Sequence, residues 1–320
     1  MVVDSLDKSA KILLTGAAGL LGQNLTTCLV DLGYRNITVL DKHQGNLDIL
    51  QQRHPQVQCV QADLSKPGPW ELEFEGKDRL FLLQAQITGD TFELFERNTI
   101  KSTENVLAAA RDHTIPFTVF IGSSVVNSVA DDNYTRSKRE QERMMRESGL
   151  AHCIARPTLM FGWFDPKHLG WLSRFMERYP VYPIPGHGRY MRQPLYVQDF
   201  CRVLIWCVEH CPNGKIYDIV GCENIDYIDI IRTIKRVKKL RTIVLPIPIT
   251  LFRSLLRLYA AIIPNPPFVA DQLDALTAGD VFFGEDMEKT FGIKPTPFSQ
   301  AIDETFSHPE YSKIILERWI

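Results

Sequence analysis

The sequence has neither a marked excess of charge of one sign nor a long apolar run at its start. Its 320 residues include 36 Lys and Arg against 38 Asp and Glu, for a formal net charge of −2. Proteins that bind nucleic acid usually carry a clear basic excess, so we expect no nucleic-acid partner. The opening segment, MVVDSLDKSAKILLTG, contains acidic residues and does not resemble a secretory signal peptide. We therefore expect a cytoplasmic protein.

Cysteine is also scarce, with seven residues scattered along the chain. An odd, scattered set does not fit a disulfide framework and indicates a reducing compartment. Cys207, His210 and Cys211 would lie on one side of a helix, but no second cysteine pair follows at the spacing of a zinc site. Because cysteine packs well as a small core residue, we expect no metal there.

The first half of the chain alternates short apolar runs with helical patterns. Apolar runs that read as buried strands lie at 11–16, 37–41, 57–63, 79–85, 117–123 and 151–157. Helical patterns, such as 99–113, separate several of them. Continuous apolar strands alternating with helices predict a parallel sheet covered on both faces. We expect a doubly wound α/β domain over residues 1–160.

Prolines cluster beyond residue 157, in RYPVYPIPGHGRYMRQP and in LPIPITLF. Such stretches indicate loops or sharp connections. Helical patterns still recur around 199–211, 226–238 and 249–263. We expect residues 161–320 to form a smaller, mixed α/β lobe that binds the substrate.

The stretch ILLTGAAGLLGQNL predicts a phosphate-binding loop between the first strand and an apolar helix. Glycines there permit a tight turn and let backbone N–H groups approach a pyrophosphate, at the positive end of the helix. The residues expected at the pyrophosphate are Gly16, Gly19, Leu20, Leu21 and Gly22. Asp41 follows Gly22 by 19 residues, where a carboxylate would accept hydrogen bonds from an adenosine ribose. A carboxylate would also repel a 2′-phosphate, so we expect NAD rather than NADP.

The spacing Thr15-Gly16-x-x-Gly19-x-x-Gly22 resembles that of the extended and atypical short-chain dehydrogenase/reductases. Further matches follow in order along nearly the whole chain: QADLSKP, NVLAAA, FIGSSVV, YTRSK, IARPTLMFG and RQPLYVQDF. YTRSK matches the Tyr-x-x-x-Lys motif of the family, and RQPLYVQDF resembles a stretch of its nucleotide-sugar branch. The resemblance implies an enzyme with an NAD-binding domain of the Rossmann type.

The resemblance also implies the roles of individual residues. Ser124, Tyr134 and Lys138 would be catalytic, with Ser123 as the alternative serine. Tyrosine would act as the base toward an alcohol, and a lysine ammonium one turn away would lower its pKa. The residues implied at the cofactor are Asp63, Leu64, Gln84, Ala85, Tyr134, Lys138 and Pro157, and those at the substrate are Ser124, Tyr134 and Arg192.

Several positions depart from the pattern of the family. Nine residues separate Ser124 from Tyr134, fewer than in most relatives. Thr99 stands where many relatives have asparagine. Val125 and Val126 stand where 4,6-dehydratases carry an Asp-Glu pair that runs the elimination, so we do not expect a dehydratase.

The substrate stays open at this stage. Arg192 matches the position at which nucleotide-sugar relatives contact a diphosphate, which favours an epimerase or oxidoreductase acting on a nucleotide sugar or polyprenyl-diphosphate sugar. One alternative is an oxidoreductase similar to 3β-hydroxysteroid dehydrogenase, acting on an apolar alcohol. Another is a non-catalytic nucleotide-binding accessory protein, which the C-terminal half resembles. A homodimer is a further prediction for this chain.

The segment ITLFRSLLRLYAAII (249–263) has two interpretations. It is too short and too charged to span a bilayer, which needs about 20 mainly apolar residues. It predicts either a packing helix of the smaller lobe or a helix lying in the membrane interface. The second interpretation would place the protein at the inner face of the membrane.

Overall fold

The structure, a computed structural model, describes residues 6–129, 131–262, 273 and 282–317. Within these residues a seven-stranded parallel sheet has the strand order β11-β6-β5-β4-β1-β2-β3. Its strands are β1 (Lys11–Thr15), β2 (Asn36–Asp41), β3 (Gln58–Gln61), β4 (Arg79–Leu82), β5 (Phe117–Ile121), β6 (His152–Pro157) and β11 (Ile216–Ile219). The order and the direction of the strands confirm the predicted doubly wound α/β fold, and every predicted apolar run contains a strand.

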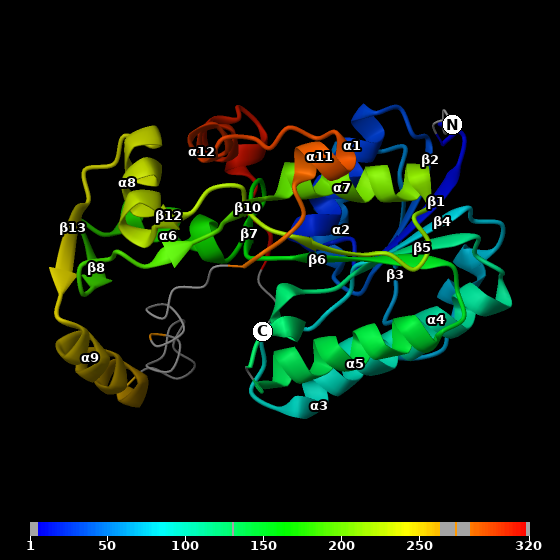
Figure 1. Cartoon of the computed structure of the whole chain (residues 1–320), viewed down its shortest axis with the longest axis horizontal. Helices are drawn as coiled ribbons and strands as arrows, with labels where there is room; N and C mark the ends of the chain where they lie inside the picture. Colours follow the sequence, from blue (N-terminus) through cyan, green and yellow to red (C-terminus); the bar gives the residue numbers. More distant parts are fainter. Residues whose placement is uncertain (1–5, 130, 263–272, 274–281, 318–320) are drawn as a thin grey trace.

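Helices cover both faces of the sheet (Figure 1). One face carries α1 (Leu20–Asp31), α2 (Gln44–Arg53) and α7 (Val197–His210); the other carries α3 (Phe92–Phe95), α4 (Ser102–Asp112) and α5 (Asn133–Glu147). Successive side chains of a strand point to opposite faces. Accordingly, Leu14 of β1 belongs to the same core cluster as Phe200 of α7, while Leu13 belongs to the cluster of Met145 of α5. Both faces are buried, which explains the uninterrupted apolar runs.

The smaller lobe is built from short strand pairs and helices, at the left of Figure 1. The pairs are β7 (Met160–Phe161) with β10 (Leu195–Tyr196), β8 (Val181–Pro185) with β13 (Ile243–Ile247), and β9 (Met191–Arg192) with β12 (Ile225–Asp226). Among the described residues, the second half also contains the helices α6 (His168–Arg178), α8 (Tyr227–Val237), α9 (Ile249–Ile262), α11 (Met287–Phe291) and α12 (Phe298–Ser307). Leu172, Ile184, Ile231 and Ile302 share the core of this lobe.

Two elements that follow residue 160 belong to the layers of the sheet. Strand β11 pairs with β6, and helix α7 packs on the face that α1 covers. The chain therefore enters the smaller lobe, returns to complete the sheet, and leaves again. The division at residue 160 stays a prediction.

Tight turns complete the connections. They are η1 (Pro69–Phe74), the π-helical turn η2 (Glu96–Lys101), η3 (Ser124–Asn127) and η4 (Tyr311–Lys313). Two of these turns border the candidate active site. The turn η3 follows directly after β5, and η2 leads into α4 beside the end of β4.

Candidate active site

The loop between β1 and α1 depends on its glycines. Gly16 has a φ of +70°, and a Cβ on it would lie 2.5 Å from the backbone nitrogen of Gln84, so the turn requires glycine. A Cβ on Gly22 would lie 2.4 Å from the backbone of Ala17, so glycine lets α1 pack closely on the loop. A Cβ on Gly19 would meet nothing nearer than 3.8 Å. Gly19 is the N-cap of α1, and backbone N–H groups at such a helix end are suited to a phosphate group.

Asp41 ends β2 and faces this loop. Its carboxylate accepts hydrogen bonds from the backbone N–H of Ala18, at 2.9 Å, and of His43, at 3.0 Å. Burial raises the pKa of Asp41, while these backbone hydrogen bonds act to lower it. Each carboxylate oxygen can accept a further hydrogen bond. The fixed orientation of the carboxylate therefore suits two neighbouring ribose hydroxyls.

The other predicted cofactor residues lie along the same edge of the sheet. Asp63 and Leu64 follow β3, Gln84 and Ala85 follow β4, and Pro157 ends β6. The Asp63 carboxylate accepts hydrogen bonds from the backbone N–H and the hydroxyl of Ser65, and Leu64 is buried. In open α/β sheets this carboxyl edge is where ligands bind. Leu20 and Leu21 form the first turn of α1, where backbone N–H groups have no acceptor within the helix.

Helix α5 places Tyr134 and Lys138 next to the end of β5. The helix begins at Asp132, whose carboxylate accepts a hydrogen bond from the backbone N–H of Thr135 at 2.9 Å. Its buried face includes Lys138, Gln141, Glu142 and Met145, spaced as one stripe of a helix. The helix is rich in charged residues, yet this stripe turns several polar side chains inward.

Tyr134 is hydrogen-bonded by Ser123. Burial raises the pKa of Tyr134, while the side-chain hydrogen bond with Ser123 acts to lower it. Ser123 precedes the turn η3, and its hydroxyl also accepts from the backbone N–H of Val125 at 3.5 Å. Ser124 is the first residue of that turn and is buried. The structure thus brings the alternative serine to Tyr134, and the catalytic role of Ser124 stays a prediction.

Lys138 is buried, four residues after Tyr134 on α5. Its Nζ donates to the backbone carbonyl of Ile121 at 2.7 Å and to Oε1 of Gln141 at 2.6 Å. Burial lowers the pKa of Lys138 to about 7, because the ammonium is removed from water, and the charge of Glu142 acts to raise it.

Glu142 forms a buried ion pair that the sequence interpretation missed. Its carboxylate accepts from Nε of Arg156 at 2.9 Å and from Nη2 at 2.5 Å, a two-point contact between α5 and β6. Nη1 of Arg156 lies 3.5 Å from Oδ1 of Asp218 on β11. The polar residues at 138, 141 and 142 share one helical face, and this spacing could have identified Gln141 and Glu142 from the sequence.

Arg192 lies in the smaller lobe, on β9. It is half-buried, and its backbone pairs with Ile225 of β12. Burial raises the pKa of the nearby Tyr227, while the positive charge of Arg192 acts to lower it. The hydroxyl groups of Tyr227 and Tyr182 are hydrogen-bonded at 2.7 Å.

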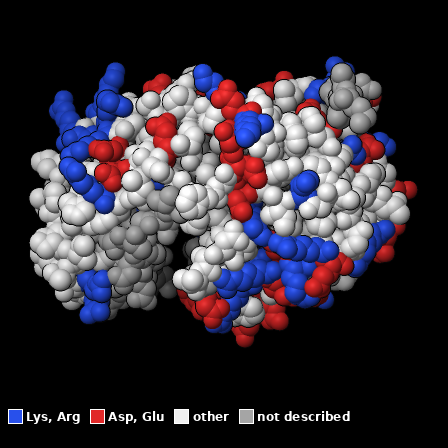
Figure 2. Space-filling view, in the orientation of Figure 1, with Lys and Arg blue, Asp and Glu red and all other residues white. Residues whose placement is uncertain are grey.

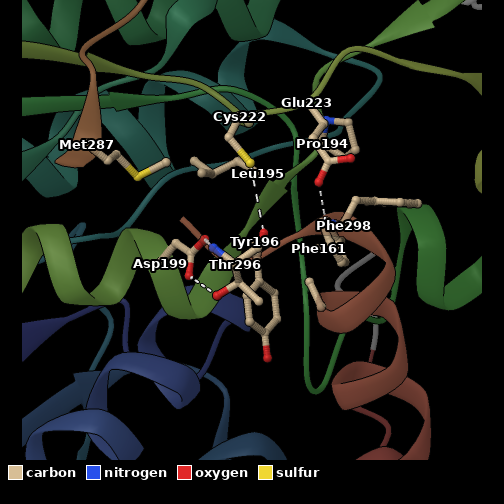
Figure 3. Close-up of a pocket in the computed structure, with 12 residues that line it drawn as sticks. Phe161, Pro194, Leu195, Tyr196, Asp199, Cys222, Glu223, Met287, Thr296 and Phe298 are labelled. Carbon is tan, nitrogen blue, oxygen red and sulfur yellow. Dashed lines mark hydrogen bonds between the residues drawn. The ribbon is translucent and has the colours of Figure 1, made fainter. Parts of the chain in front are cut away.

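A small pocket between α7 and the C-terminal segment is shown in Figure 3. Its volume is about 10 Å³, room for about one water molecule. The Asp199 carboxylate accepts from the backbone N–H and the hydroxyl of Thr296, both at 2.7 Å, and so fastens the C-terminal segment to α7 (Figure 3). The pocket is too small for a sugar or a lipid.

The fold and the candidate active site together indicate a class of enzyme. A parallel sheet with a glycine loop after β1, an acid at the end of β2, and a tyrosine followed one turn later by a buried lysine on α5 is the arrangement of a nucleotide-dependent oxidoreductase. The chain belongs to the NAD dependent epimerase/dehydratase family, whose model matches residues 12–220. The expected family, its enzymatic character and its use of NAD are confirmed.

Known proteins resemble this chain at low identity. The ceramide reductase of Caulobacter vibrioides is 26% identical over 181 residues, 56% of this chain and 55% of that protein. The sterol-4-alpha-carboxylate 3-dehydrogenase, decarboxylating, of Mus musculus is 24% identical over 253 residues, 71% of this chain and 68% of that protein. The match thus spans about half the length of the ceramide reductase.

Solved structures share the fold. DesIV, a dTDP-glucose 4,6-dehydratase from Streptomyces venezuelae with NAD and TYD bound, superimposes with a TM-score of 0.73 and 18% identity, covering 93% of this chain and 97% of that one. Among the described residues, no cluster of three or more His, Cys, Asp or Glu side chains could hold a metal ion. Across the same residues, every helix is too short or too polar to cross a membrane.

Proposed function

We propose that this enzyme transfers a hydride between NAD and a secondary alcohol or ketone of an apolar, lipid-like substrate. The observation that carries the reaction type is Tyr134, which interacts with Ser123 and shares helix α5 with the buried Lys138, four residues further on. The substrate class is supported by two relatives, a ceramide reductase and a sterol dehydrogenase. This choice prefers the apolar alternative of the sequence interpretation to the diphosphate-linked sugar.

Different residues of the chain would hold the cofactor and move the proton. Bound NAD supplies the hydride acceptor or donor. The loop at Gly19 would hold its pyrophosphate, and Asp41 its adenosine ribose. Tyr134 would take the hydroxyl proton during oxidation and return it during reduction. Ser123 would fix the reacting oxygen near Tyr134, and the charge of Lys138 would favour the tyrosinate.

A substrate panel tests the proposal. Purified protein would be incubated with NAD⁺ and a 3β-hydroxysteroid, an N-acylated long-chain amino alcohol, or a UDP-hexose, and NADH formation would be followed by absorbance. We expect turnover with an apolar alcohol and loss of turnover in Tyr134→Phe. Interconversion of the UDP-hexose alone would overturn the substrate class, and unchanged rates in Tyr134→Phe would overturn the reaction.

Helix α9 supports access to a lipid substrate. Leu251, Leu255 and Leu258 are 51%, 47% and 60% exposed and share one face of the helix. Ile243 and Leu245 of β13 are exposed as well. Figure 2 shows positive charge at the lower left, where Figure 1 places α9. We propose that this face lies in the interface of a bilayer, with cations toward anionic headgroups. Of the predicted helix 249–263, residue 263 lies outside the described residues.

Liposome binding tests the role of α9. Co-sedimentation with vesicles of phosphatidylcholine and phosphatidylserine should fall strongly when Leu251, Leu255 and Leu258 are changed to Gln. Leu72→Gln is a matched control, because Leu72 is 66% exposed on η1, in the other lobe. Equal sedimentation of the triple variant and the native protein would refute a contact through α9.

A sugar carried on a diphosphate remains the second candidate, because of Arg192. Its guanidinium suits a diphosphate, and it lies beside the tyrosine pair of the smaller lobe. UDP should then bind the native protein and bind Arg192→Ala at least about tenfold more weakly, since charge-assisted hydrogen bonds contribute about 1.5–3 kcal/mol. Equal binding of UDP by both proteins would remove this candidate. The homodimer stays a prediction.

A further inference from the structure

We propose that Gln141 is a positioning residue, whose side-chain carbonyl holds the Lys138 ammonium and ties it to the end of β4 beside the phosphate loop. The inference rests on the proposed function of Lys138. Gln141 is fully buried, three residues after Lys138 on α5. Its Oε1 accepts from Nζ of Lys138 at 2.6 Å, and the backbone carbonyl of Ile121 accepts from the same ammonium at 2.7 Å.

The orientation of the Gln141 amide is fixed by two partner groups, one of which can only accept a hydrogen bond and the other only donate one. Nε2 donates to the backbone carbonyl of Gln84 at 3.0 Å and to Oγ1 of Thr103 at 2.8 Å. A backbone carbonyl only accepts and an ammonium only donates. The amide nitrogen must therefore face Gln84, and the amide oxygen must face Lys138. A flipped amide would place a donor against a donor and an acceptor against an acceptor.

The same contacts connect Lys138 to the phosphate loop. The Gln84 side-chain carbonyl accepts from Oγ1 of Thr15 at 2.5 Å. The backbone of Gln84 also borders Gly16, where a Cβ would lie 2.5 Å from its nitrogen. A hydrogen-bonded path thus runs from Lys138 through Gln141 to the loop proposed to hold the pyrophosphate.

The hydroxyl of Thr99 bonds to the segment that follows β4. Thr99 stands where many relatives have asparagine, and its Oγ1 accepts from the backbone N–H of Gln86 at 2.8 Å. Thr99 lies in the π-helical turn η2 and steadies the segment after β4. The polar side chain that reaches Lys138 comes from α5 instead.

Charged groups around Lys138 set the expected direction of a change. Glu142 follows on the same helix and acts to raise the pKa of Lys138, but it is paired with Arg156 of β6, which also contacts Asp218 of β11. Tyr134 is neutral while protonated. Loss of the Gln141 carbonyl would remove an acceptor from a buried ammonium and lower its pKa. A carboxylate at 141 would add an opposite charge and raise it.

The test uses the full chain with NAD⁺ and needs no substrate. The ¹³Cε and ¹⁵Nζ resonances of labelled lysine would be titrated, with Lys138 assigned by loss of its signal in Lys138→Arg. We expect the pKa of Lys138 to fall by at least about half a unit in Gln141→Met and to rise by about one unit or more in Gln141→Glu. Opposite shifts distinguish positioning from a merely structural role.

Gln198→Met is the matched control. Gln198 is a partly buried glutamine on α7 whose Nε2 donates to Oδ1 of Asn24 at 2.7 Å, and its loss should leave Lys138 unchanged. If Gln141→Met does not fold, Gln141→Glu alone decides by its upward shift. An unchanged pKa of Lys138 in both Gln141 variants, or shifts in the same direction, would overturn the inference. Failure of the hydride-transfer proposal would appear separately, in the Tyr134→Phe assay.

Discussion

The ion pair between Glu142 and Arg156 gives the sharpest prediction about stability. Side chains of both residues are buried, at 6% and 10% exposed, and they join α5 to β6 under the site. Glu142→Gln keeps the shape of the side chain and removes its charge. Arg156 would then remain buried with a weaker set of acceptors: Asp218, whose Oδ1 lies 3.5 Å away, and Asn127, whose Oδ1 lies 3.2 Å away.

The size of the loss follows from this geometry. Removing one partner of a buried ion pair typically costs about 3–5 kcal/mol, because the other charge is left buried without its counter-charge. Asp218 still compensates part of the charge, so we expect a loss of about 3 kcal/mol. For a chain of this size, about 3 kcal/mol corresponds to a fall in Tm of roughly 6 °C. The double variant Glu142→Gln/Arg156→Met should recover a large part of the loss, because neither charge is left unpaired.

The effect should depend on pH. Burial acts to raise the pKa of Glu142, but hydrogen bonds from Arg156 and Arg146 act to lower it and prevail, so the pKa is lowered. A carboxyl with a lowered pKa stabilises the fold above its unfolded pKa of about 4.3, and this contribution is lost as the pH falls through the folded value. The Tm difference between native protein and Glu142→Gln should therefore be complete near neutral pH and shrink below about pH 4.3.

Differential scanning calorimetry measures these differences. Glu140→Gln is the control: Glu140 is on the same helix and pairs with Arg143 at the surface, where ion pairs contribute little. A Tm of Glu142→Gln within a degree or so of the Glu140→Gln value would refute the reasoning. So would a double variant whose loss equals the sum of the two single losses, because the coupling between the two charges would then be absent.

Other variants separate cofactor binding from folding and from chemistry. Gly19→Ala should leave Tm without cofactor unchanged, since its Cβ would meet nothing nearer than 3.8 Å, and should weaken NAD binding at least about tenfold by calorimetry; equal NAD affinity would place the pyrophosphate elsewhere. Gly22→Ala should instead lower Tm, because its Cβ would overlap Ala17. Tyr134→Phe should bind NAD normally and turn over undetectably in the NADH assay. Asp41→Ala should reduce the preference for NAD over NADP in competition binding.

The central strands could be predicted from the sequence because they are buried on both faces. Strands covered on both faces need uninterrupted apolar runs, as in the fully buried β5. Strand β11 was missed because it is not a continuous apolar run: IYDI contains Asp218 and alternates half-buried with buried residues. The pair Tyr134 and Lys138 was predictable because it lies within one helix, where sequence spacing fixes the geometry.

Contacts between distant segments could not be predicted in the same way. Whether Ser123 or Ser124 meets Tyr134 depends on how η3 turns after β5, and adjacent residues at a strand end differ in direction. The partner of Glu142 lies 14 residues away on a strand, and the carbonyl that Gln141 bonds lies 57 residues away. The packing of α5 on the sheet brings these distant residues together. The spacing of residues along the sequence does not predict that packing.

The polar cluster on α5 also explains how a buried lysine can serve a tyrosine base. Burial alone lowers the pKa of Lys138 and raises that of Tyr134, so in the chain by itself both groups tend toward their neutral forms. Neutral lysine would not favour a tyrosinate. The fixed acceptors around Nζ, the carbonyls of Ile121 and Gln141, counteract that loss of charge. Both acceptors therefore favour the charged lysine, and a lysine ammonium favours the tyrosinate.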